Sequence, residues 1–457
     1  MCVSQHFRVL SHSMDTQTLF KQHISELQQG WGEALQKTQP ECDAVLIHSG
    51  SSHHYFADDH APPFKAWGHF LRWAPVDRAD QFVLFAPGRK PRLLALVPRD
   101  FWHDQSLPTE RWWADCLNIT FMEGLSELAA QLPDAATLVF LGENKELATD
   151  LGIPPKQTNP APLMSWLDYD RAVKTDYEIS RLRQANVHAL RGHAAAEQTF
   201  RAGGDEYDIH HAYLAACRVL DQELPYSNII ALNEKAAILH YQNKRRYVDR
   251  TVKPANRVLL IDAGCRAQGY CSDISRTWAA DNAHPVFHDL LNGMQTLQAS
   301  LVHSVKPGVS FADLHRKAHL GVAQLLADTG ICQGDADALV DNGTSTLFFP
   351  HGLGHLLGLQ VHDVGGRLAN REGDIAAPPA QWPGLRNTRT LDAGAVVTIE
   401  PGLYFIPALL EPARTSAAGQ SINWPLADEL IPFGGIRVED NVLVTANGAD
   451  NLTRNAE

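Results

Sequence analysis

Three apolar segments of the chain carry an acidic residue where a strand interior would ordinarily continue. They are Val258–Asp262 (VLLID), Val396–Glu400 (VVTIE) and Ile436–Val444, which contains Glu439. An acid at the end of an apolar strand loses hydration unless it is paired or coordinates a cation. Asp273 follows Asp262 by eleven residues, a separation that allows a hairpin to bring the two carboxylates face to face. The pattern predicts carboxylates gathered around a cation. The alternative is structural: Asp262 caps a turn and Asp273 pairs with Arg276.

A histidine-dense segment, FPHGLGHLLGLQVHD, lies between these strands and holds His351, His355 and His362. Three histidines within twelve positions indicate ligands or substrate contacts rather than ordinary core residues. His351 and His355 have the spacing of a zinc-binding H-E-x-x-H helix. Gly352 and Gly354 disfavour a helix, however, and the glutamate of that motif is absent, so that class of zinc site is excluded.

The ordered set of acids and histidine resembles the five-ligand site of the pita-bread metallopeptidases, which include methionine aminopeptidase, aminopeptidase P and prolidase. Its motifs are DAG…YCSDISRT, HGLGH…VHDVGG, TIEPG and IRVED, and the matching ligands are Asp262, Asp273, His355, Glu400 and Glu439. The segment IHSG…YFADDHAPPFKAW and the insertion between TIEPG and IRVED resemble the bacterial prolidases, or Xaa-Pro dipeptidases, in particular. The resemblance spans the chain from Met14, which is an alternative start to Met1.

The resemblance implies hydrolysis of dipeptides with proline at the C-terminal position, with a metal-bridging hydroxide as nucleophile. Asp273 and Glu439 would bridge two ions, Asp262 would complete one site, and His355 with Glu400 the other. Four carboxylates and one imidazole suit two divalent ions of the Mn²⁺ type, with Co²⁺ or Zn²⁺ as substitutes. Glu400 would also carry the proton from the nucleophile to the leaving nitrogen.

Further roles follow from the same resemblance. His362 and His351 would hydrogen-bond the substrate carbonyl or the developing oxyanion. The substrate carboxylate would meet Arg437 and Arg386, since a guanidinium fork suits a carboxylate. The remaining predicted substrate contacts are His240, Tyr226 and, from the N-terminal domain of a partner subunit, Asp59 or Asp58.

Each substrate contact has a structural alternative. Arg437 stands two residues before Glu439, so strand alternation points both side chains to one face; it could instead form a structural salt bridge. Arg389 competes with Arg386 for the carboxylate role. His240 could be a core histidine on a strand, and Tyr226 and Asp59 could be ordinary loop residues.

The elements that must position these residues predict an α/β (α+β) fold with two domains. By resemblance these are a creatinase-like N-terminal domain, 1–165, and a pita-bread catalytic domain, 166–457. The patterns predict a helix through Leu19–Trp31, a hairpin around Pro87-Gly88 and a Pro-rich linker. The predicted strands are Asp43–His48, Gln81–Ala86, Arg92–Val97, Thr137–Gly142 and Asn228–Leu232; the predicted helices are Glu143–Leu151, Thr175–Phe200, Glu206–Leu220, Pro285–Val305 and Phe311–Asp328; the linker is Pro154–Pro162.

The composition of the chain limits the kinds of partner that we expect for the protein. The 457 residues hold 39 Lys+Arg against 52 Asp+Glu, a net charge of −13, which argues against a nucleic-acid partner and makes the basic run Lys244–Arg246 a surface turn. No apolar run reaches the ~18–20 residues of a membrane helix, and the first residues lack a signal-peptide pattern. The seven cysteines form no C-x-x-C pair. We therefore expect a cytoplasmic protein, and by resemblance a homodimer, with no membrane partner.

Three alternatives share the predicted architecture. An aminopeptidase P-like exopeptidase would use the same metal set on longer peptides, and organophosphate hydrolysis would be a side activity of a prolidase site. A non-enzymatic pita-bread binding module is disfavoured because all five ligands are present.

Overall fold

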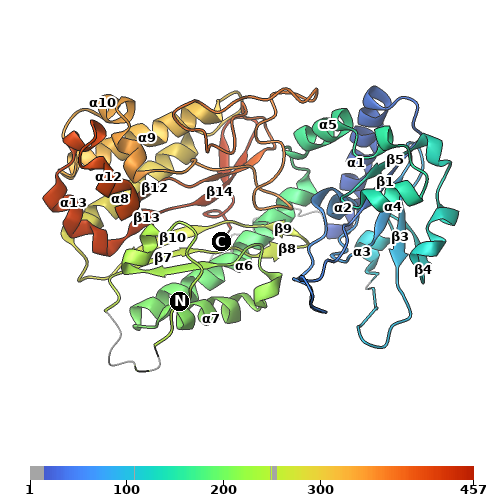
Figure 1. Ribbon diagram of the computed structural model, residues 1–457, viewed down its shortest axis with the longest axis horizontal. Helices are drawn as coiled ribbons and strands as arrows, with labels where there is room; N and C mark the ends of the chain where they lie inside the picture. The colour runs from blue at the N-terminus through green and yellow to red at the C-terminus, as the bar shows by residue number, and fades with distance from the viewer. Residues whose placement is uncertain (1–14, 108, 248, 250–254, 457) are drawn as a thin grey trace, which may run out of the picture. The chain divides into compact units, whose positions relative to one another are not determined.

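The computed structural model describes residues 15–107, 109–247, 249 and 255–456. The chain forms two compact units, Met1–Pro160 with Thr175–Tyr177, and Ala161–Lys174 with Glu178–Glu457 (Figure 1). Residues 1–14, and with them the alternative start at Met14, lie outside the described residues. Within the described ranges, no helix has both the length and the apolar character needed to cross a membrane.

The first unit is built on a mixed five-stranded sheet in the order β4-β3-β2-β1-β5. The β1–β2 and β2–β3 pairs are antiparallel, whereas β1–β5 and β3–β4 are parallel. Its elements are α1 (Thr16–Thr38), β1 (Ala44–His48), α2 (Gly68–Trp73), β2 (Phe82–Phe85), β3 (Arg92–Leu96), α3 (Arg111–Ala114), β4 (Asn118–Met122), β5 (Leu138–Leu141) and α4 (Lys145–Asp150). The predicted hairpin around Pro87-Gly88 is confirmed as β2–β3.

The second unit contains the remaining strands and most of the helices (Figure 1). They are α5 (Ala161–Arg171), α6 (Asp176–Arg201), α7 (Glu206–Cys217), β6 (Ile229–Leu232), β7 (Val258–Asp262), β8 (Arg266–Ala267), β9 (Tyr270–Cys271), β10 (Ser275–Ala279), α8 (Pro285–His303), α9 (Phe311–Asp328), α10 (Ala336–Asp341), α11 (Thr344–Phe348), β11 (Val396–Ile399), β12 (Gly402–Tyr404), α12 (Pro407–Ala413), α13 (Trp424–Leu430), β13 (Gly435–Arg437), β14 (Asp440–Val444) and β15 (Ala449–Asn451). The helices predicted as Thr175–Phe200, Pro285–Val305 and Phe311–Asp328 are confirmed to within two residues. Helix α7 ends three residues before the predicted Leu220, because Arg218 adopts a left-handed conformation with φ 56°.

The continuous apolar run of β7 is explained by burial on both faces of the β10-β7-β6 sheet. Leu259 and Ile261 belong to one apolar cluster with residues of α6 and α7. Val258 and Leu260 belong to another, with residues of α8 and α9. Alternate residues of a strand point to opposite faces, so both faces of β7 need apolar side chains. Asp262 is the residue at which this buried run stops.

The prediction of one strand through Ile436–Val444 is wrong. Strand β13 pairs with β12, whereas β14 pairs with β11, so the chain changes sheets between them. The two residues at the change bond elsewhere: Val438 N donates to Pro401 O at 3.4 Å and Glu439 N to Ser275 O at 3.1 Å. Glu439 thus sits in a break between two strands rather than inside one.

Candidate metal centre

Asp262 and Asp273 meet as the predicted hairpin requires. Strand β7 pairs antiparallel with β10, with Asp262 opposite Ser275, so that Asp273 lies just before the paired segment. The Tyr226 hydroxyl lies 2.7 Å from Asp262 Oδ1 and 2.5 Å from Asp273 Oδ1, so one group touches both carboxylates. The alternative pairing of Asp273 with Arg276 is not formed, because Arg276 bonds Asp440 at 2.7 Å. The two acids face a common point.

His355 reaches the same point from a loop that runs along β11. His355 N donates to Thr398 Oγ1 at 3.0 Å, and Thr398 N donates to His355 O at 2.9 Å. A Cβ on Gly354 would lie 2.1 Å from Thr398 O, so this approach requires glycine. Leu353 O accepts from Glu400 N at 2.8 Å, which places Glu400 beside the histidine. The glycines that excluded a helix here allow the loop to pack on the strand.

The His355 ring is oriented for coordination. Its Nδ1 lies 3.0 Å from Leu356 O, and because a carbonyl only accepts, the proton resides on Nδ1. Its Nε2 lies 3.4 Å from Asp273 Oδ2 and 3.5 Å from Glu400 Oε1. Ligand atoms of Asp273, His355 and Glu439 all lie within 4.8 Å of one another. A carbonyl on one ring nitrogen with the other aimed at carboxylates is the usual setting of a metal-ligating histidine.

Glu439 and Arg437 converge on Ser275. Arg437 Nε donates to Ser275 Oγ at 2.8 Å, and Ser275 Oγ donates to Glu439 Oε2 at 2.6 Å. Arg437 also pairs with Asp262 at 2.6 Å, so the structural salt bridge named as its alternative is present in this arrangement. Although Arg437 and Glu439 do not lie in one strand, both side chains bond the Ser275 hydroxyl.

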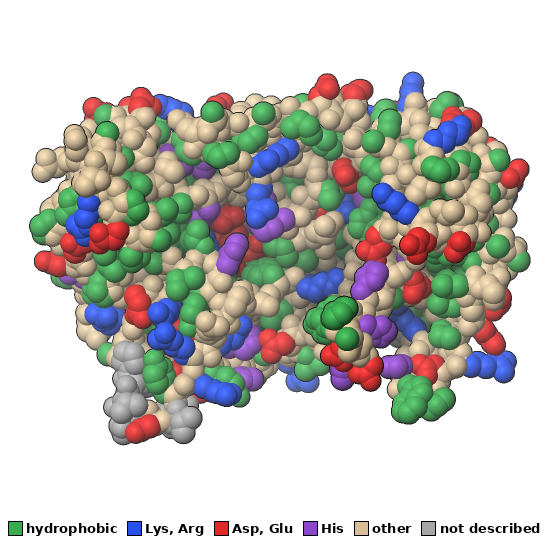
Figure 2. Space-filling view, in the orientation of Figure 1, with side chains coloured by type: hydrophobic (Ala, Val, Ile, Leu, Met, Phe, Trp, Pro, Cys, Tyr) green, Lys and Arg blue, Asp and Glu red, His purple; other side chains and the backbone are tan. Residues whose placement is uncertain are grey.

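The electrostatics of the cluster favour a cation. Burial and then the neighbouring carboxylates raise the pKa of Glu439 well above its ordinary range. Burial, opposed in part by His355 and Arg437, raises the pKa of Glu400 to about 7, and burial raises that of Asp262 to about 6. Several buried acids that resist losing their protons gain most from nearby positive charge. Figure 2 shows acidic and histidine side chains gathered in a recess of the second unit.

His351 lies at the edge of the cluster with both ring nitrogens engaged. Burial, and then the Arg437 charge, lowers its pKa to about 3, so the ring is neutral near pH 7. Nδ1 donates to Gly352 O at 2.8 Å, and Nε2 accepts from the Tyr404 hydroxyl at 2.9 Å. Tyr404 in turn accepts from Arg437 at 3.0 Å. His351 therefore ends a hydrogen-bonded row that begins at Arg437.

Three more predicted substrate contacts, His362, His240 and Arg386, are exposed. The His362 ring lies edge-on to His355, with centroids 4.4 Å apart. Partial loss of hydration, and then the neighbouring His355, lowers the pKa of the His362 ring to about 4. Arg389, the competing candidate, is buried, with its guanidinium 3.7 Å from the centre of the Tyr169 ring. The structure thus separates Arg386, which faces solvent, from a structural Arg389.

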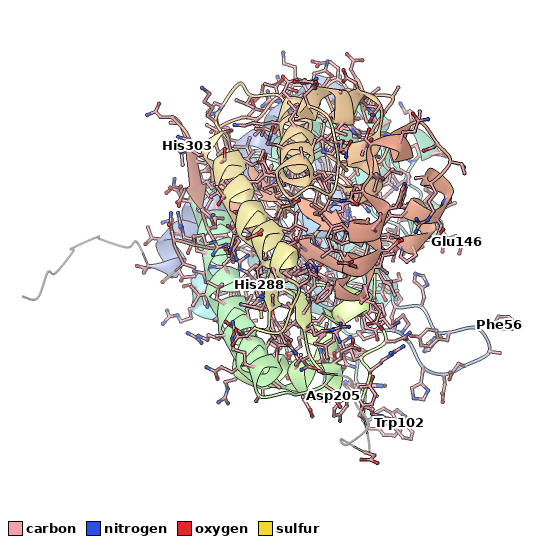
Figure 3. All side chains as sticks on the ribbon, turned by 90° about the vertical axis from the view of Figure 1, so that its left-hand side faces the viewer. Phe56, Trp102, Glu146, Asp205, His288 and His303 are labelled. Carbon is pink, nitrogen blue, oxygen red and sulfur yellow. The ribbon has the colours of Figure 1, made fainter. Side chains whose placement is uncertain are left out.

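Asp59 lies in the first unit on an exposed loop that also carries Asp58, His60 and Phe56. The labelled Phe56 projects from this loop in Figure 3 and is fully exposed. Asp59 is paired with His60 at 3.1 Å. The structure therefore shows Asp59 as accessible.

Sequence reasoning missed two residues of the centre, Ser275 and Tyr404. Ser275 could have been found from the hairpin register, since it stands opposite Asp262. Tyr404 carries no local signal, because it reaches His351 and Arg437 only after β12 pairs with β13.

Comparison with known proteins decides the family. The profile described as metallopeptidase family M24 matches residues 180–446, and the profile described as Xaa-Pro dipeptidase, N-terminal domain, matches residues 18–169. An Xaa-Pro dipeptidase of Pseudoalteromonas atlantica is 42% identical over 95% of this chain and 98% of its own length. One from Shewanella baltica is 43% identical over 95% of this chain and 97% of its own. The chain belongs to the Xaa-Pro dipeptidases of family M24.

Solved structures show the same fold. Aminopeptidase P of E. coli with the inhibitor Pro-Leu superposes with a TM-score of 0.72 at 22% identity, covering 96% of this chain and 95% of that one. The expected two-part architecture with a C-terminal pita-bread domain is therefore confirmed. Membership in a metallopeptidase family and the donor set described above assign a divalent-metal site to the cluster.

Proposed function

We propose that this chain hydrolyses dipeptides with proline at the C-terminal position, as a metal-dependent Xaa-Pro dipeptidase. The observation that carries the proposal is the convergence of Asp273, His355 and Glu439, with Asp262 and Glu400 in contact with the same group. Relatives about 42% identical over nearly the whole chain bear the name Xaa-Pro dipeptidase.

Two divalent ions, Mn²⁺ first among them, would be held by these five side chains. Asp273 and Glu439 are the most deeply buried acids of the set, and Asp262, His355 and Glu400 would complete the ligands that hold the ions. Oxygen-rich ligation by four carboxylates favours Mn²⁺ over thiolate-preferring metals. When bound, such a pair of ions polarises a peptide carbonyl and makes water acidic enough to lose a proton near neutral pH.

Glu400 would move the proton that the reaction requires. A proline nitrogen is a tertiary amide nitrogen and must be protonated before it leaves. The Glu400 side chain is 16% exposed beside His355, so its carboxylate can take up a proton from water and release it to that nitrogen. His362, exposed beside His355, would donate to the substrate carbonyl or the developing oxyanion. The same role for His351 requires its Tyr404 hydrogen bond to be exchanged for the substrate.

The dipeptide carboxylate would be recognised by Arg386 and Arg437. Arg386 is exposed, which leaves its guanidinium accessible. Arg437 is buried against Asp262, and a cation that takes the same carboxylate would free one arm of its fork. His240 and Tyr226 would line the pocket, His240 from the solvent side and Tyr226 beside the two aspartates.

We further propose that the protein is a cytoplasmic homodimer, in which Asp59 of one subunit completes the substrate pocket of the other subunit. Large exposed aromatic side chains on the first unit support an interface there: Phe56 on the Asp59 loop, and Phe101 with Trp102, whose ring centroids lie 4.7 Å apart. Figure 3 labels Phe56 and Trp102, which both project outward. Size-exclusion chromatography with light scattering tests the dimer, and a Phe56→Ser variant should weaken it. Cell fractionation tests the location.

Comparing Ala-Pro with Ala-Pro-Ala as substrates of the Mn²⁺-loaded protein tests the function. A carboxylate clamp makes the dipeptide the better substrate by at least about tenfold in kcat/KM, since an unmet guanidinium costs more than 1.4 kcal/mol. Equal or faster cleavage of the tripeptide would establish the aminopeptidase P alternative instead.

A further inference from the structure

The segment that carries His240 is held in place at one buried carboxylate. This segment, residues 232–247, leaves β6, passes through a short 3₁₀ turn at Asn233–Ala237 and continues without regular structure. We call it the His240 segment. Glu206, the first residue of α7, lies beneath it and is 2% exposed.

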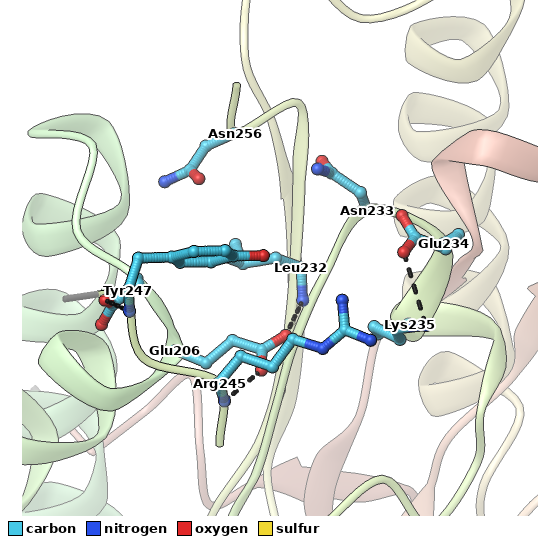
Figure 4. A pocket seen from close by; sticks show the side chains of 9 residues that line it. Glu206, Leu232, Asn233, Glu234, Lys235, Arg245, Tyr247 and Asn256 are labelled. Atoms are coloured by element: carbon cyan, nitrogen blue, oxygen red, sulfur yellow. Dashed lines mark hydrogen bonds and ion pairs between the residues drawn. The ribbon is translucent and has the colours of Figure 1, made fainter. Parts of the chain in front are cut away.

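Glu206 accepts hydrogen bonds from both sides of His240. Oε1 accepts from Leu232 N at 3.1 Å, and Oε2 accepts from the Tyr241 hydroxyl at 2.8 Å and from Arg245 N at 2.7 Å. Figure 4 shows the Glu206 carboxylate between Leu232 and Arg245, in a pocket that these residues line with Asn256 and Tyr247. The neighbouring Asp205 adds a bond from Tyr247 N at 2.9 Å.

The chemistry of this contact requires a carboxylate. Three donors converge on two oxygens, and an ionised carboxylate is the side chain that only accepts. Burial raises the pKa of Glu206, while the bonds from Arg245 and Leu232 oppose that rise and stabilise the charged form. A glutamine side chain has the same shape, but its NH2 group would face at least one backbone N–H, and two donors cannot form a hydrogen bond with each other. Glutamine at this position would therefore release part of the segment.

Beyond Tyr241 the stretch is also held by two bonds of the α7 N-terminus, from Tyr207 N to Arg245 O at 3.1 Å and from Tyr247 N to Asp205 at 2.9 Å, but by few apolar contacts. Gln242, Asn243, Arg245 and Arg246 are exposed or extend into solvent, so apolar burial contributes little to their position. The basic run Lys244–Arg246, predicted as a surface turn, contributes to this contact because the backbone N–H of Arg245 bonds Glu206. His240, a predicted substrate contact, is exposed and lies in the chain between Leu232 and Tyr241, the two residues of the segment that bond Glu206 on either side of it.

We propose that Glu206 is a positioning residue: it fixes the His240 segment so that His240 meets the dipeptide in the substrate pocket. The proposal rests on the dipeptidase function proposed above. Because Glu206 acts on binding geometry and touches no metal ligand, it determines KM rather than metal content or the chemical step.

The first test compares Glu206→Gln with Glu234→Gln, a matched change of an exposed acid that lines the same pocket and pairs with Lys235 at 3.5 Å. With Mn²⁺-loaded protein and Ala-Pro, Glu206→Gln should raise KM about five- to tenfold, change kcat less than twofold and leave two ions per chain. The control should match the parent. An unchanged KM, or a loss of bound metal that explains the lower rate, would overturn the proposal.

The second test asks whether Glu206 acts through His240. In a double-mutant cycle, His240→Ala and Glu206→Gln together should raise KM no more than His240→Ala alone. Additive effects, or a His240→Ala variant with the parent's KM, would contradict the positioning role.

A readout without catalysis separates this proposal from the dipeptidase function. Trypsin should cut at Lys244–Arg246 several-fold faster in Glu206→Gln than in Glu234→Gln, because the segment is released. Equal cleavage rates would mean that Glu206 does not hold the segment. If the parent protein does not hydrolyse Ala-Pro, the proposed dipeptidase function is wrong. The trypsin cleavage rates would still show whether Glu206 holds the His240 segment in place.

Discussion

The Ser275 hydroxyl donates a 2.6 Å hydrogen bond to Glu439 and accepts one of 2.8 Å from Arg437. One buried hydroxyl thereby fixes the orientation of a proposed metal ligand and of the guanidinium next to it. Partners that orient metal-ligating carboxylates commonly set metal affinity without touching the metal.

Replacing Ser275 with alanine should therefore weaken metal binding while the fold survives. We expect the affinity for Mn²⁺ to fall about 10- to 100-fold, measured by titration of metal-free protein. Ser272→Ala is the matched control, since the equally buried Ser272 hydroxyl bonds only backbone groups among the described residues, donating to Ala185 O at 3.2 Å and accepting from Cys265 N at 3.0 Å. Equal losses of affinity in both variants would show that Ser275 has no special role.

Asp363 is expected to be essential for stability. Its side chain is 1% exposed and pairs with Arg171 at 2.5 Å and Lys174 at 3.0 Å, both equally buried. Asp363→Asn removes the carboxylate that pairs with both buried cations and should lower the free energy of unfolding by about 3–5 kcal/mol. Urea denaturation of metal-free protein measures this. The exposed Asp374→Asn should change stability by less than about 0.5 kcal/mol, and a similarly small effect at Asp363 would rule out the network's contribution.

The buried His315 should make stability depend on pH. Burial lowers its pKa to about 4, against about 6.5 in an unfolded chain, so between these values the unfolded state binds the extra proton. Stability is then lost as pH falls below about 6.5, by about 1.4 kcal/mol per pH unit. Between pH 6.5 and 5 the parent should lose about 1.6 kcal/mol more than His315→Phe, because the slope is only half its full value at pH 6.5. If the curves of stability against pH run parallel for the parent and His315→Phe, His315 does not cause the effect. As a control, His303→Gln, changed at an exposed histidine, should have the same pH dependence as the parent.

Gly354 sets the approach of the histidine loop to β11. A Cβ there would lie 2.1 Å from Thr398 O, so Gly354→Ala must push the loop away from the strand and displace His355. We expect a loss of about 3 kcal/mol in stability together with reduced metal content. Gly384→Ala, where a Cβ would meet nothing within 4 Å, should behave as the parent. Full metal content in Gly354→Ala would mean that the close approach does not position the ligand.

Much of this architecture was predictable from local pattern. The apolar runs of β1 and β7 and the amphipathic α8 and α9 follow from spacing, and the order of acids and histidines was enough to indicate the family. The break at Glu439 was not predictable, because Ile436–Val444 is continuously strand-like and only pairing with two different sheets divides it. Tyr404 and Glu206 were missed for a similar reason: their partners come from distant segments. The domain limits at 165 and the individual ligand and substrate roles stay predictions.

Metal analysis of Asp273→Asn beside the parent tests the central claim most directly. Asp273 lies beside His355, touches Tyr226 and has a pKa lowered by the histidine despite its burial, so it is the carboxylate most committed to being charged. Elemental analysis should find two divalent ions per chain in the parent and a loss of bound metal together with Ala-Pro hydrolysis in the variant, at an unchanged circular dichroism spectrum. Undiminished hydrolysis by a variant that holds no metal would contradict the account.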